Sequence, residues 1–354
     1  MPGQRARARG AGSNATGRYE GATRSAFDDG WEIAEDDRLI RTEVRIERPR
    51  SAISYNRSPD LPFDRSINPY RGCEHGCIYC YARPTHAYLN LSPGLDFETK
   101  LIARPGIGAV LDRELRAKSY VPRTIALGTN TDPYQPVEAE HQVMREVLEV
   151  LSAFDHPLGI VTKGAMVERD LDLLAPMAAR GLARVGISVT TLDAGLARKL
   201  EPRAASPARR LAVIRRLTDA GVPVRVMVSP VIPGLTDPEI EAILEAARDA
   251  GAVAASWIML RLPLEVAPLF QEWLAEHVPD RAAKVMSRIR ETHGGRDYDP
   301  EWGRRMRGQG IWSDLIGQRF DKAVARLGLT VPQPALRTDL FRPPPRTGDQ
   351  LALF

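Results

Sequence analysis

The 354-residue sequence has few cysteines, no long apolar run and little net charge. No stretch approaches the ~18 consecutive apolar residues of a membrane span, and no apolar core of a secretory signal follows the basic start of the chain. With 49 Lys and Arg against 45 Asp and Glu, the net charge of +4 is too small to indicate a nucleic-acid partner by itself. The three cysteines lie close together, which suits a metal-binding or catalytic cluster in a reducing compartment rather than a disulfide framework. We expect a cytoplasmic protein.

The start of the chain is rich in Gly, Arg, Ala and small polar residues and shows no apolar periodicity. This composition predicts a basic, disordered arm over residues 1–45. Residues 1–24 contain five arginines and one acidic residue. Two interpretations remain open, a solvated tail and a segment that contacts nucleic acid through its charge.

Short apolar, β-branched runs alternate with segments of helical periodicity along most of the chain. The runs lie at residues 123–129, 158–163, 184–191, 222–230 and 254–260. Such runs are typical of strands buried on both faces of a parallel sheet. The helical segments between them span residues 137–154, 169–181, 206–221 and 236–251. The strand–helix unit repeats about every 30 residues, the size of a βαβ motif.

The fold prediction also includes a first strand near "RSINPY" and a first helix at 104–117, which gives about six strand–helix units, fewer than the eight of a closed barrel. We predict an α/β fold, a partial (β/α)6 TIM-type barrel over residues 50–278. An open doubly wound sheet is the alternative. A C-terminal helical extension (279–330) and a Pro-rich tail (331–354) would follow, and both termini would be flexible.

All three cysteines, Cys73, Cys77 and Cys80, lie in "CEHGCIYC" with the spacing C-x3-C-x2-C. A structural zinc site would need a fourth ligand, for which His75 or His86 is available. Three thiolates on a four-iron cluster would instead leave one iron open to an outside ligand. Open coordination positions are the ones at which metal sites perform chemistry.

The cysteine spacing, followed by Tyr81, resembles the signature of the radical S-adenosylmethionine (radical SAM) superfamily. The resemblance implies that the three cysteines hold a 4Fe–4S cluster and that SAM chelates the fourth iron. It also implies reductive cleavage of SAM to a 5′-deoxyadenosyl radical, with electrons from an external donor of the flavodoxin or ferredoxin type. Under this resemblance the chain would be a metal-binding iron–sulfur enzyme.

Longer stretches narrow the resemblance. "SINPYRGCEHGCIYCYARPTHAY", "GTNTDPYQPVE" and "LTDAGVPVRVMVSPVIPGLTD" resemble the spore photoproduct lyase-like, or DNA repair photolyase-like, branch of this superfamily. The resemblance covers about residues 50–275 and implies a lyase-like reaction in DNA repair. Spore photoproduct lyases return a hydrogen atom through a further cysteine, which this chain lacks. Either Tyr81, Tyr88 or Tyr134 replaces that cysteine, or the reaction is different.

The resemblance also implies a set of cofactor-binding residues, because functional groups gather at the carboxyl ends of parallel strands. The candidates for SAM contacts are Tyr79, Thr129, Asn130, Asp132, Ser188, Thr190, Glu201 and Arg203. Tyr79 would lie near the adenine. Lys163 and Arg261, at the ends of two further strands, would meet an anionic substrate or cap the sheet.

Simpler roles remain open for several of these candidates. Asp132 precedes a proline and could be a turn residue. Ser188 and Thr190 could be ordinary strand residues with satisfied hydroxyls, and Glu201 and Arg203 could form a surface ion pair.

The last five residues, Gln350–Phe354, read "QLALF" after a proline-rich spacer. They resemble the QLxLF pentapeptide with which bacterial repair proteins and polymerases bind the sliding clamp. Its glutamine would form hydrogen bonds, and its leucines and phenylalanine would fill an apolar pocket. In the alternative interpretation, the apolar tail docks on its own domain.

Three functions follow from the sequence. The first is a radical SAM enzyme acting on nucleic acid, with DNA base damage as the substrate and DNA as the partner. The second keeps the cofactors but takes RNA, a peptide or a metabolite. The third is a non-catalytic, metal-stabilised protein that binds DNA or the clamp.

Overall fold

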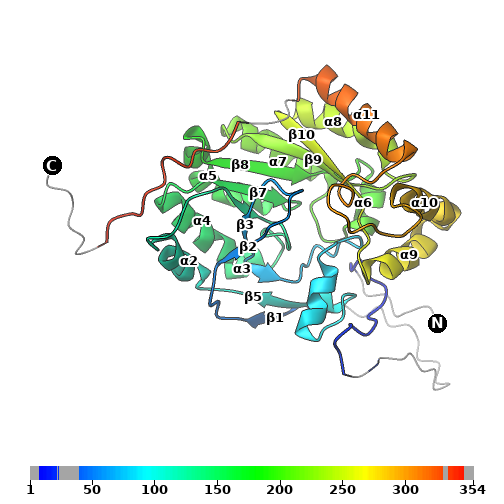
Figure 1. Ribbon diagram of the computed structural model, residues 1–354, viewed down its shortest axis with the longest axis horizontal. Coiled ribbons are helices and arrows are strands. Elements are labelled where there is room, and N and C mark those ends of the chain that lie inside the picture. The colour runs from blue at the N-terminus through cyan, green and yellow to red at the C-terminus, as the bar shows by residue number, and fades with distance from the viewer. Residues whose placement is uncertain (1–7, 22, 24–39, 330–333, 347–354) are drawn as a thin grey trace.

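The computed structural model describes residues 8–21, 23, 40–329 and 334–346 (Figure 1). None of the helices in these ranges is long and apolar enough to cross a membrane.

A sheet of seven strands forms the centre of the described structure (Figure 1). In spatial order the strands are β10 (Ala254–Met259), β9 (Val224–Val231), β8 (Ala183–Ser188), β7 (Leu158–Thr162), β6 (Ile125–Leu127), β3 (Arg65–Ile67) and β2 (Ile53–Tyr55). Neighbouring strands are parallel except β2 and β3, which are antiparallel. The predicted strands are therefore confirmed, including the first one near "RSINPY".

The strand order decides between the two predicted architectures. From β3 to β10 the spatial order follows the sequence order without a reversal. A doubly wound sheet reverses at a switch point, whereas successive right-handed crossovers in one direction place their helices on one face. The described β3 and β10 do not pair with each other, so the barrel stays open. The partial (β/α)6 barrel is confirmed, and the doubly wound alternative is wrong.

Helices from the crossovers cover the outside of the barrel (Figure 1). The longer ones are α2 (Ile107–Leu115), α4 (Val143–Ala153), α5 (Leu171–Ala179), α7 (Pro207–Asp219) and α8 (Ile240–Asp249). The shorter ones are α3 (Glu138–His141), η2 (Met166–Asp170), α6 (Ala194–Leu200) and η3 (Asp237–Glu239). α4 lies within the helical segment predicted at residues 137–154, and its apolar side chains Val143, Val147 and Leu151 each have 0% exposure. Burial of this face fixes the helix against the sheet.

A second, three-stranded sheet lies beside the barrel. It has the order β1 (Glu43–Ile46), β5 (Lys100–Ala103) and β4 (Tyr70–Arg71). Two short helices, η1 (Arg83–Leu89) and α1 (Asp96–Thr99), lie between β4 and β5 in the sequence. The loop that contains the three cysteines (residues 72–80, here called the cysteine loop) begins directly after β4. This sheet therefore lies beside the loop.

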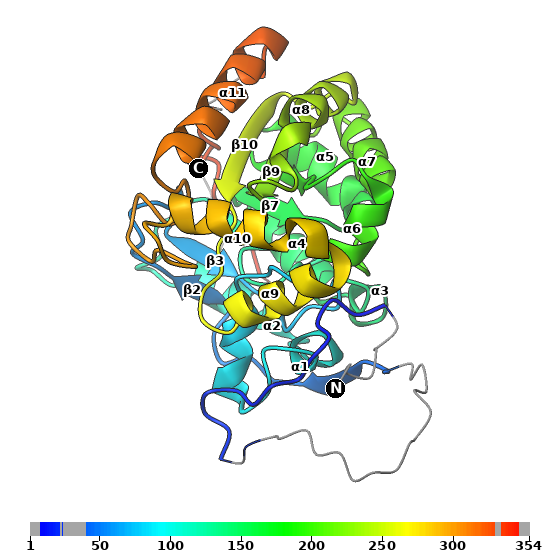
Figure 2. The ribbon, with the colours of Figure 1, turned by 90° about the vertical axis from the view of Figure 1, so that its right-hand side faces the viewer.

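The predicted C-terminal helices are confirmed as α10 (Pro279–Thr292) and α11 (Ile311–Leu327), preceded by α9 (Val266–His277). α11 lies beside α8 and β10 (Figures 1 and 2). Its Phe320 ring lies 6.2 Å from the Trp257 ring of β10. This contact closes the edge of the barrel at β10.

The described part of the Pro-rich tail, residues 334–346, crosses the outside of the barrel near α5 and α2. Phe341 packs against Phe154, Tyr120 and His156, with centroid distances of 6.1, 5.6 and 5.4 Å. This part of the tail is packed on the barrel rather than free. The pentapeptide Gln350–Phe354 lies outside the described residues.

The N-terminal prediction needs a correction. Residues 8–21 do not form a free arm, because they lie along the cysteine loop, α1 and α9 (Figure 2). The Gly- and Ala-rich composition predicted a disordered arm. The same small residues allow close backbone contacts, which composition alone does not reveal.

Candidate functional site

The cysteine loop follows β4 through a glycine with a left-handed backbone. Gly72 has φ +76°, and a Cβ atom there would lie 2.6 Å from a Leu101 methyl carbon and 2.9 Å from the Phe97 oxygen. The Cys73 amide donates to the Phe97 carbonyl over 2.9 Å. The loop is therefore bound to α1 at its first cysteine, and only a glycine fits at the turn before it.

All three thiols are free, and Cys73 and Cys77 are buried while Cys80 is half-buried. The Cys80 amide donates to the Cys77 carbonyl over 3.1 Å, which turns the chain between these two residues. Burial raises the pKa of the Cys73 and Cys77 thiols in the absence of a bound cation. A bound cation would reverse this effect, because metal ligation favours the thiolate.

The donor set fits an iron–sulfur cluster better than a mononuclear zinc site. His75 Nδ1 lies 3.3 Å from Asp132 Oδ2 and His86 Nε2 lies 2.9 Å from the Lys100 oxygen, and each histidine keeps a second ring nitrogen. In the described ranges no three His, Cys, Asp or Glu side chains converge on one ion position. Three thiolates that bind three different irons need no such convergence. Cys73, Cys77 and Cys80 would hold the cluster.

Contacts from distant segments fix the rest of the loop. The Glu74 amide donates to Gln135 Oε1 over 2.8 Å, and the Ile78 amide donates to the Leu200 carbonyl over 3.0 Å. The buried Arg83 donates to the Cys77 carbonyl over 3.0 Å. The loop thus has a set conformation before any ligand binds.

A buried polar group lies at the ends of β7 and β8. The Glu201 carboxylate accepts from Thr190 Oγ1 over 2.8 Å and from the Tyr79 hydroxyl. Arg210 forms a buried ion pair with Glu201, and Lys163 Nζ lies 3.9 Å from it. Burial would raise the pKa of Glu201, but Arg210 and Lys163 outweigh burial and lower it to about 2. Tyr79, Thr190 and Lys163, all named from the sequence, therefore meet around the Glu201 carboxylate.

The carboxylate of Asp132 joins β6, β7 and the cysteine loop. Its Oδ1 accepts from the Tyr134 amide over 2.9 Å and from Thr162 Oγ1 over 2.6 Å, and its Oδ2 accepts from the Lys163 amide over 2.7 Å. Burial would raise the pKa of Asp132, but His75 and these hydrogen bonds lower it to about 2. These contacts match the turn interpretation of Asp132, and its predicted contact with SAM stays a prediction.

Tyr81, directly after Cys80, is half-exposed, with 42% exposure. Its hydroxyl donates to the Thr129 carbonyl, and the Arg261 guanidinium lies 4.5 Å from its ring centroid. Arg261 Nε is buried without a hydrogen-bond partner within the described structure. A guanidinium beside a half-exposed aromatic ring suits a substrate with both a planar ring and an anionic group.

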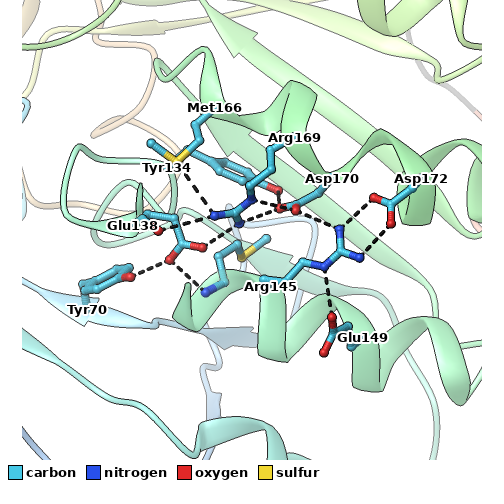
Figure 3. A network of polar contacts seen from close by, with 10 residues as sticks. Tyr70, Tyr134, Glu138, Arg145, Glu149, Met166, Arg169, Asp170 and Asp172 are labelled. Atoms are coloured by element: carbon cyan, nitrogen blue, oxygen red, sulfur yellow. Dashed lines mark hydrogen bonds and ion pairs between the residues drawn. The ribbon is translucent and has the colours of Figure 1, made fainter. Parts of the chain in front are cut away.

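The other two tyrosine candidates make their contacts elsewhere. Tyr88 is 69% exposed, and its ring stacks on Tyr19 at 5.4 Å. The Tyr134 hydroxyl donates to Asp170 Oδ2 over 3.0 Å (Figure 3). Tyr81 is therefore the one of the three that the contacts place beside Thr129 and Arg261.

Figure 3 shows the network that contains Tyr134. Its charged and phenolic members are Tyr70, Tyr134, Glu138, Arg145, Glu149, Arg169, Asp170 and Asp172. Tyr70 of β4 donates to the buried Glu138, and Arg169 pairs with Glu138 over 2.7 Å. The network holds the strand that leads into the cysteine loop, and the predicted catalytic role of Tyr134 stays a prediction.

The remaining candidates are Arg203, Ser188, Thr129 and Asn130. The surface pair of Glu201 and Arg203 is wrong, because Glu201 has 2% exposure and Arg203 instead lies 3.3 Å from Glu74. Ser188 is buried on β8, where its carbonyl accepts from Arg210 over 3.1 Å. Asn130 is half-buried next to Thr129. Their predicted contacts with SAM stay predictions.

Two parts of the site were missed from the sequence. Arg210, the partner of Glu201, comes from the first turn of α7, and the Arg83–Glu98 pair supports the cysteine loop from η1 and α1. Arg83 lies in the quoted stretch that contains the cysteines, but neither Arg83 nor Arg210 was singled out from the sequence. Their burial, which leaves 2% exposure or less for each of these four side chains, is the signal that identifies them in the structure.

Comparisons with known proteins agree with this geometry. The sequence model of the Radical SAM superfamily matches residues 67–247. The uncharacterized protein Rv2578c of Mycobacterium tuberculosis is 40% identical over 248 residues, 70% of this chain and 72% of that protein. A spore photoproduct lyase complexed with dinucleoside spore photoproduct is similar in fold, with a TM-score of 0.57, 18% identity, and coverage of 80% of this chain and 78% of that chain. A mutant spore photoproduct lyase with bound AdoMet and dinucleoside spore photoproduct has a TM-score of 0.55 at 17% identity and the same coverage.

Proposed function

The chain belongs to the radical SAM superfamily, and from this premise we propose that it is a radical SAM enzyme acting on damaged DNA. The observation that carries the proposal is the placement of Tyr81. Its half-exposed ring, directly after the last cysteine, lies 4.5 Å from the Arg261 guanidinium. The likeness in fold to a spore photoproduct lyase complexed with a dinucleoside spore photoproduct supports a nucleic-acid substrate.

The three cysteines would hold a 4Fe–4S cluster and leave one iron open for SAM. When bound, the cluster and SAM supply a one-electron cleavage that yields a 5′-deoxyadenosyl radical. An external electron donor of the flavodoxin or ferredoxin type would supply that electron.

The buried group around Glu201 would hold the SAM side of the site. Because Arg210 keeps Glu201 anionic, the carboxylate accepts from Tyr79 and Thr190 and fixes both side chains. Lys163 Nζ lies above the Tyr79 ring, 5.8 Å from its centroid, and donates to the Ser229 carbonyl over 3.3 Å. This ammonium group would pair with the carboxylate of SAM.

Tyr81 would return a hydrogen atom to the substrate radical. The chain has three cysteines, all in the cluster motif, so no thiol remains for this step. The phenol would give its O–H hydrogen atom to a carbon radical on the substrate, and the resulting phenoxyl radical would regain its O–H group by taking one electron from the external donor and one proton from solvent. Arg261 would hold the ring and bind a phosphate of the substrate.

The proposal is tested by anaerobic reconstitution of the full chain, followed by incubation with dithionite, SAM and ultraviolet-irradiated DNA. We expect about four irons per chain, formation of 5′-deoxyadenosine, and loss of a lesion that mass spectrometry identifies. Deuterium should exchange between the lesion and 5′-deoxyadenosine. If 5′-deoxyadenosine forms but irradiated DNA is unchanged, the substrate is of another class, and RNA, peptide and metabolite pools should be tested in its place.

A further inference from the structure

Residues 8–17, here called the N-terminal strap, lie directly on the cysteine loop. Two consecutive amides of the strap donate to one carboxylate, since the Gly10 amide lies 2.8 Å from Glu98 Oε2 and the Ala11 amide lies 2.9 Å from Glu98 Oε1. Ala11 has 3% exposure and belongs to the buried apolar cluster that also contains Cys77. Figure 2 shows the strap passing between α1 and α9.

The strap and the loop approach each other at two glycines. A Cβ atom on Gly10 would lie 1.8 Å from the Gly76 carbonyl oxygen, which is closer than any side chain could fit. Gly76 has φ +66°, and a Cβ atom there would lie 2.6 Å from Glu98 Oε2. The two backbones therefore touch, and each position tolerates only glycine.

Glu98 connects the strap to the cysteine ligands through Arg83. The pair is fully buried, with 0% exposure of both side chains. Arg83 donates to the Cys77 carbonyl over 3.0 Å and to the Gly76 carbonyl over 3.2 Å. One carboxylate thus binds the strap on one side and, through Arg83, the backbone between two cysteines on the other.

Further contacts hold the strap along its length. Asn14 and Asp96 exchange two hydrogen bonds of 3.0 Å each, one between side chains and one from the Asp96 amide to Asn14 Oδ1. Ser13 Oγ donates to Glu272 of α9 over 2.7 Å, and Arg9 donates to the Glu98 carbonyl over 2.8 Å. The strap therefore bridges α1 and α9 across the cysteine loop.

We propose that the N-terminal strap covers the cysteine loop and that Gly10 and Glu98 are positioning residues for the metal ligands. The strap shields Cys77 from water, and the Glu98–Arg83 pair sets the backbone that directs the thiols. This proposal rests on the proposed function only in that the thiols bind a cluster. The strap makes no contact with SAM or substrate in it.

The test compares Gly10→Ala with Gly12→Ala. A Cβ atom on Gly12 would meet only Glu276 Oε2 at 3.8 Å, so this variant is a matched control two residues away. Thiol alkylation by iodoacetamide is measured on cluster-free protein at neutral pH. We expect Cys77 in Gly10→Ala to react at least about tenfold faster than in the wild type, since tenfold corresponds to about 1.4 kcal/mol of local opening. Gly12→Ala should match the wild type.

A deletion of residues 1–11 tests the same contacts without steric strain. It should also speed alkylation of Cys77, while urea unfolding of the deleted protein keeps a single cooperative transition. Equal alkylation rates in Gly10→Ala, the deletion and the wild type overturn the proposal. Faster alkylation that occurs only together with loss of the cooperative transition also overturns it, because the strap would then support the whole fold rather than the loop.

Reconstituted protein separates this proposal from the proposed function. The strap variants should lose iron and sulfide faster in air, and the midpoint potential of the cluster should rise, because added water stabilises the more negative reduced form. A wild-type protein that takes up no iron contradicts the proposed function, whatever the alkylation rates show. A wild-type cluster whose potential and lifetime are the same in Gly10→Ala contradicts the strap alone.

Discussion

The guanidinium of Arg261 lies over the ring of Tyr81, 4.5 Å from its centroid. The Tyr81 hydroxyl is fixed at the same time by the Thr129 carbonyl at the end of β6. A phenol that acts as a hydrogen-atom donor needs a neutral O–H group with a set direction, and these two contacts provide it. The ring is half-exposed in spite of them, so it remains available to a substrate.

Replacement of Tyr81 by Phe removes the O–H group and keeps the ring. We expect SAM cleavage to continue, while repaired product falls by at least about tenfold, a change of about 1.4 kcal/mol in the barrier. In D2O the phenol carries deuterium, so wild-type enzyme should place solvent deuterium in the product. Mass spectrometry of the product measures both effects.

Tyr88→Phe is the matched control for this variant. Tyr88 lies on η1, is 69% exposed and stacks on Tyr19, so its loss should leave product yield and deuterium content unchanged. If Tyr81→Phe gives the wild-type deuterium content, a different group returns the hydrogen atom.

Replacement of Cys77 by Ala should abolish cluster binding. Two thiolates cannot hold the cube with one iron open, so iron content should fall from about four per chain to below about one. Formation of 5′-deoxyadenosine should be lost with it. Iron and sulfide analysis after anaerobic reconstitution checks the first outcome, and chromatography checks the second. A variant that keeps about four irons would require a ligand outside the cysteine motif.

The barrel and the cysteine loop could be predicted because their signals are local. The run at residues 158–163 has a strand's pattern by itself, and "CEHGCIYC" contains all of its ligands within one loop. Val143, Val147 and Leu151 repeat with the period of a helix face. Such patterns can be recognised without knowing which other residues they contact.

The supporting contacts could not be predicted, because each depends on a partner far away in the sequence. Tyr79 meets Glu201 across 122 positions, and Gly10 meets Glu98 across 88. Composition alone made residues 8–21 resemble a disordered arm, although glycines permit the close backbone contact that fixes them. The three-dimensional path of the chain decides which small or charged residue becomes buried.

Replacement of Glu201 by Gln should destabilise the protein by about 3–5 kcal/mol, because it leaves the buried guanidinium of Arg210 without its counter-charge. Urea unfolding of the cluster-free protein measures this loss. The double variant Glu201→Gln/Arg210→Met should recover part of the stability, since no buried charge remains unpaired.

Glu245→Gln is the control for that loss, because the Glu245–Arg326 pair is exposed and should contribute at most about 1 kcal/mol. A double variant less stable than Glu201→Gln alone would mean that Arg210 stabilises the fold through other contacts, such as its hydrogen bond to the Ser188 carbonyl.

His156 makes the stability of the barrel depend on pH. Burial lowers its pKa from 6.5 to about 4, and its Nε2 lies 2.7 Å from the Tyr120 hydroxyl. The Phe341 ring of the tail packs against it at 5.4 Å. The neutral imidazole is therefore part of the contact that holds the tail to the barrel.

The unfolded chain binds a proton at His156 below pH 6.5, whereas the folded chain stays neutral until about pH 4. Folding stability should therefore fall as the pH is lowered through this window, by about 2 kcal/mol between pH 7 and pH 5 from this group. Urea unfolding of cluster-free protein at both pH values measures the total change. His86 and His293 also have a lowered pKa, so the difference between the wild type and His156→Gln isolates this contribution. His156→Gln should be less stable at pH 7 but lose about 2 kcal/mol less on acidification. An equal loss in both proteins would mean that His156 is protonated in the folded barrel at pH 5.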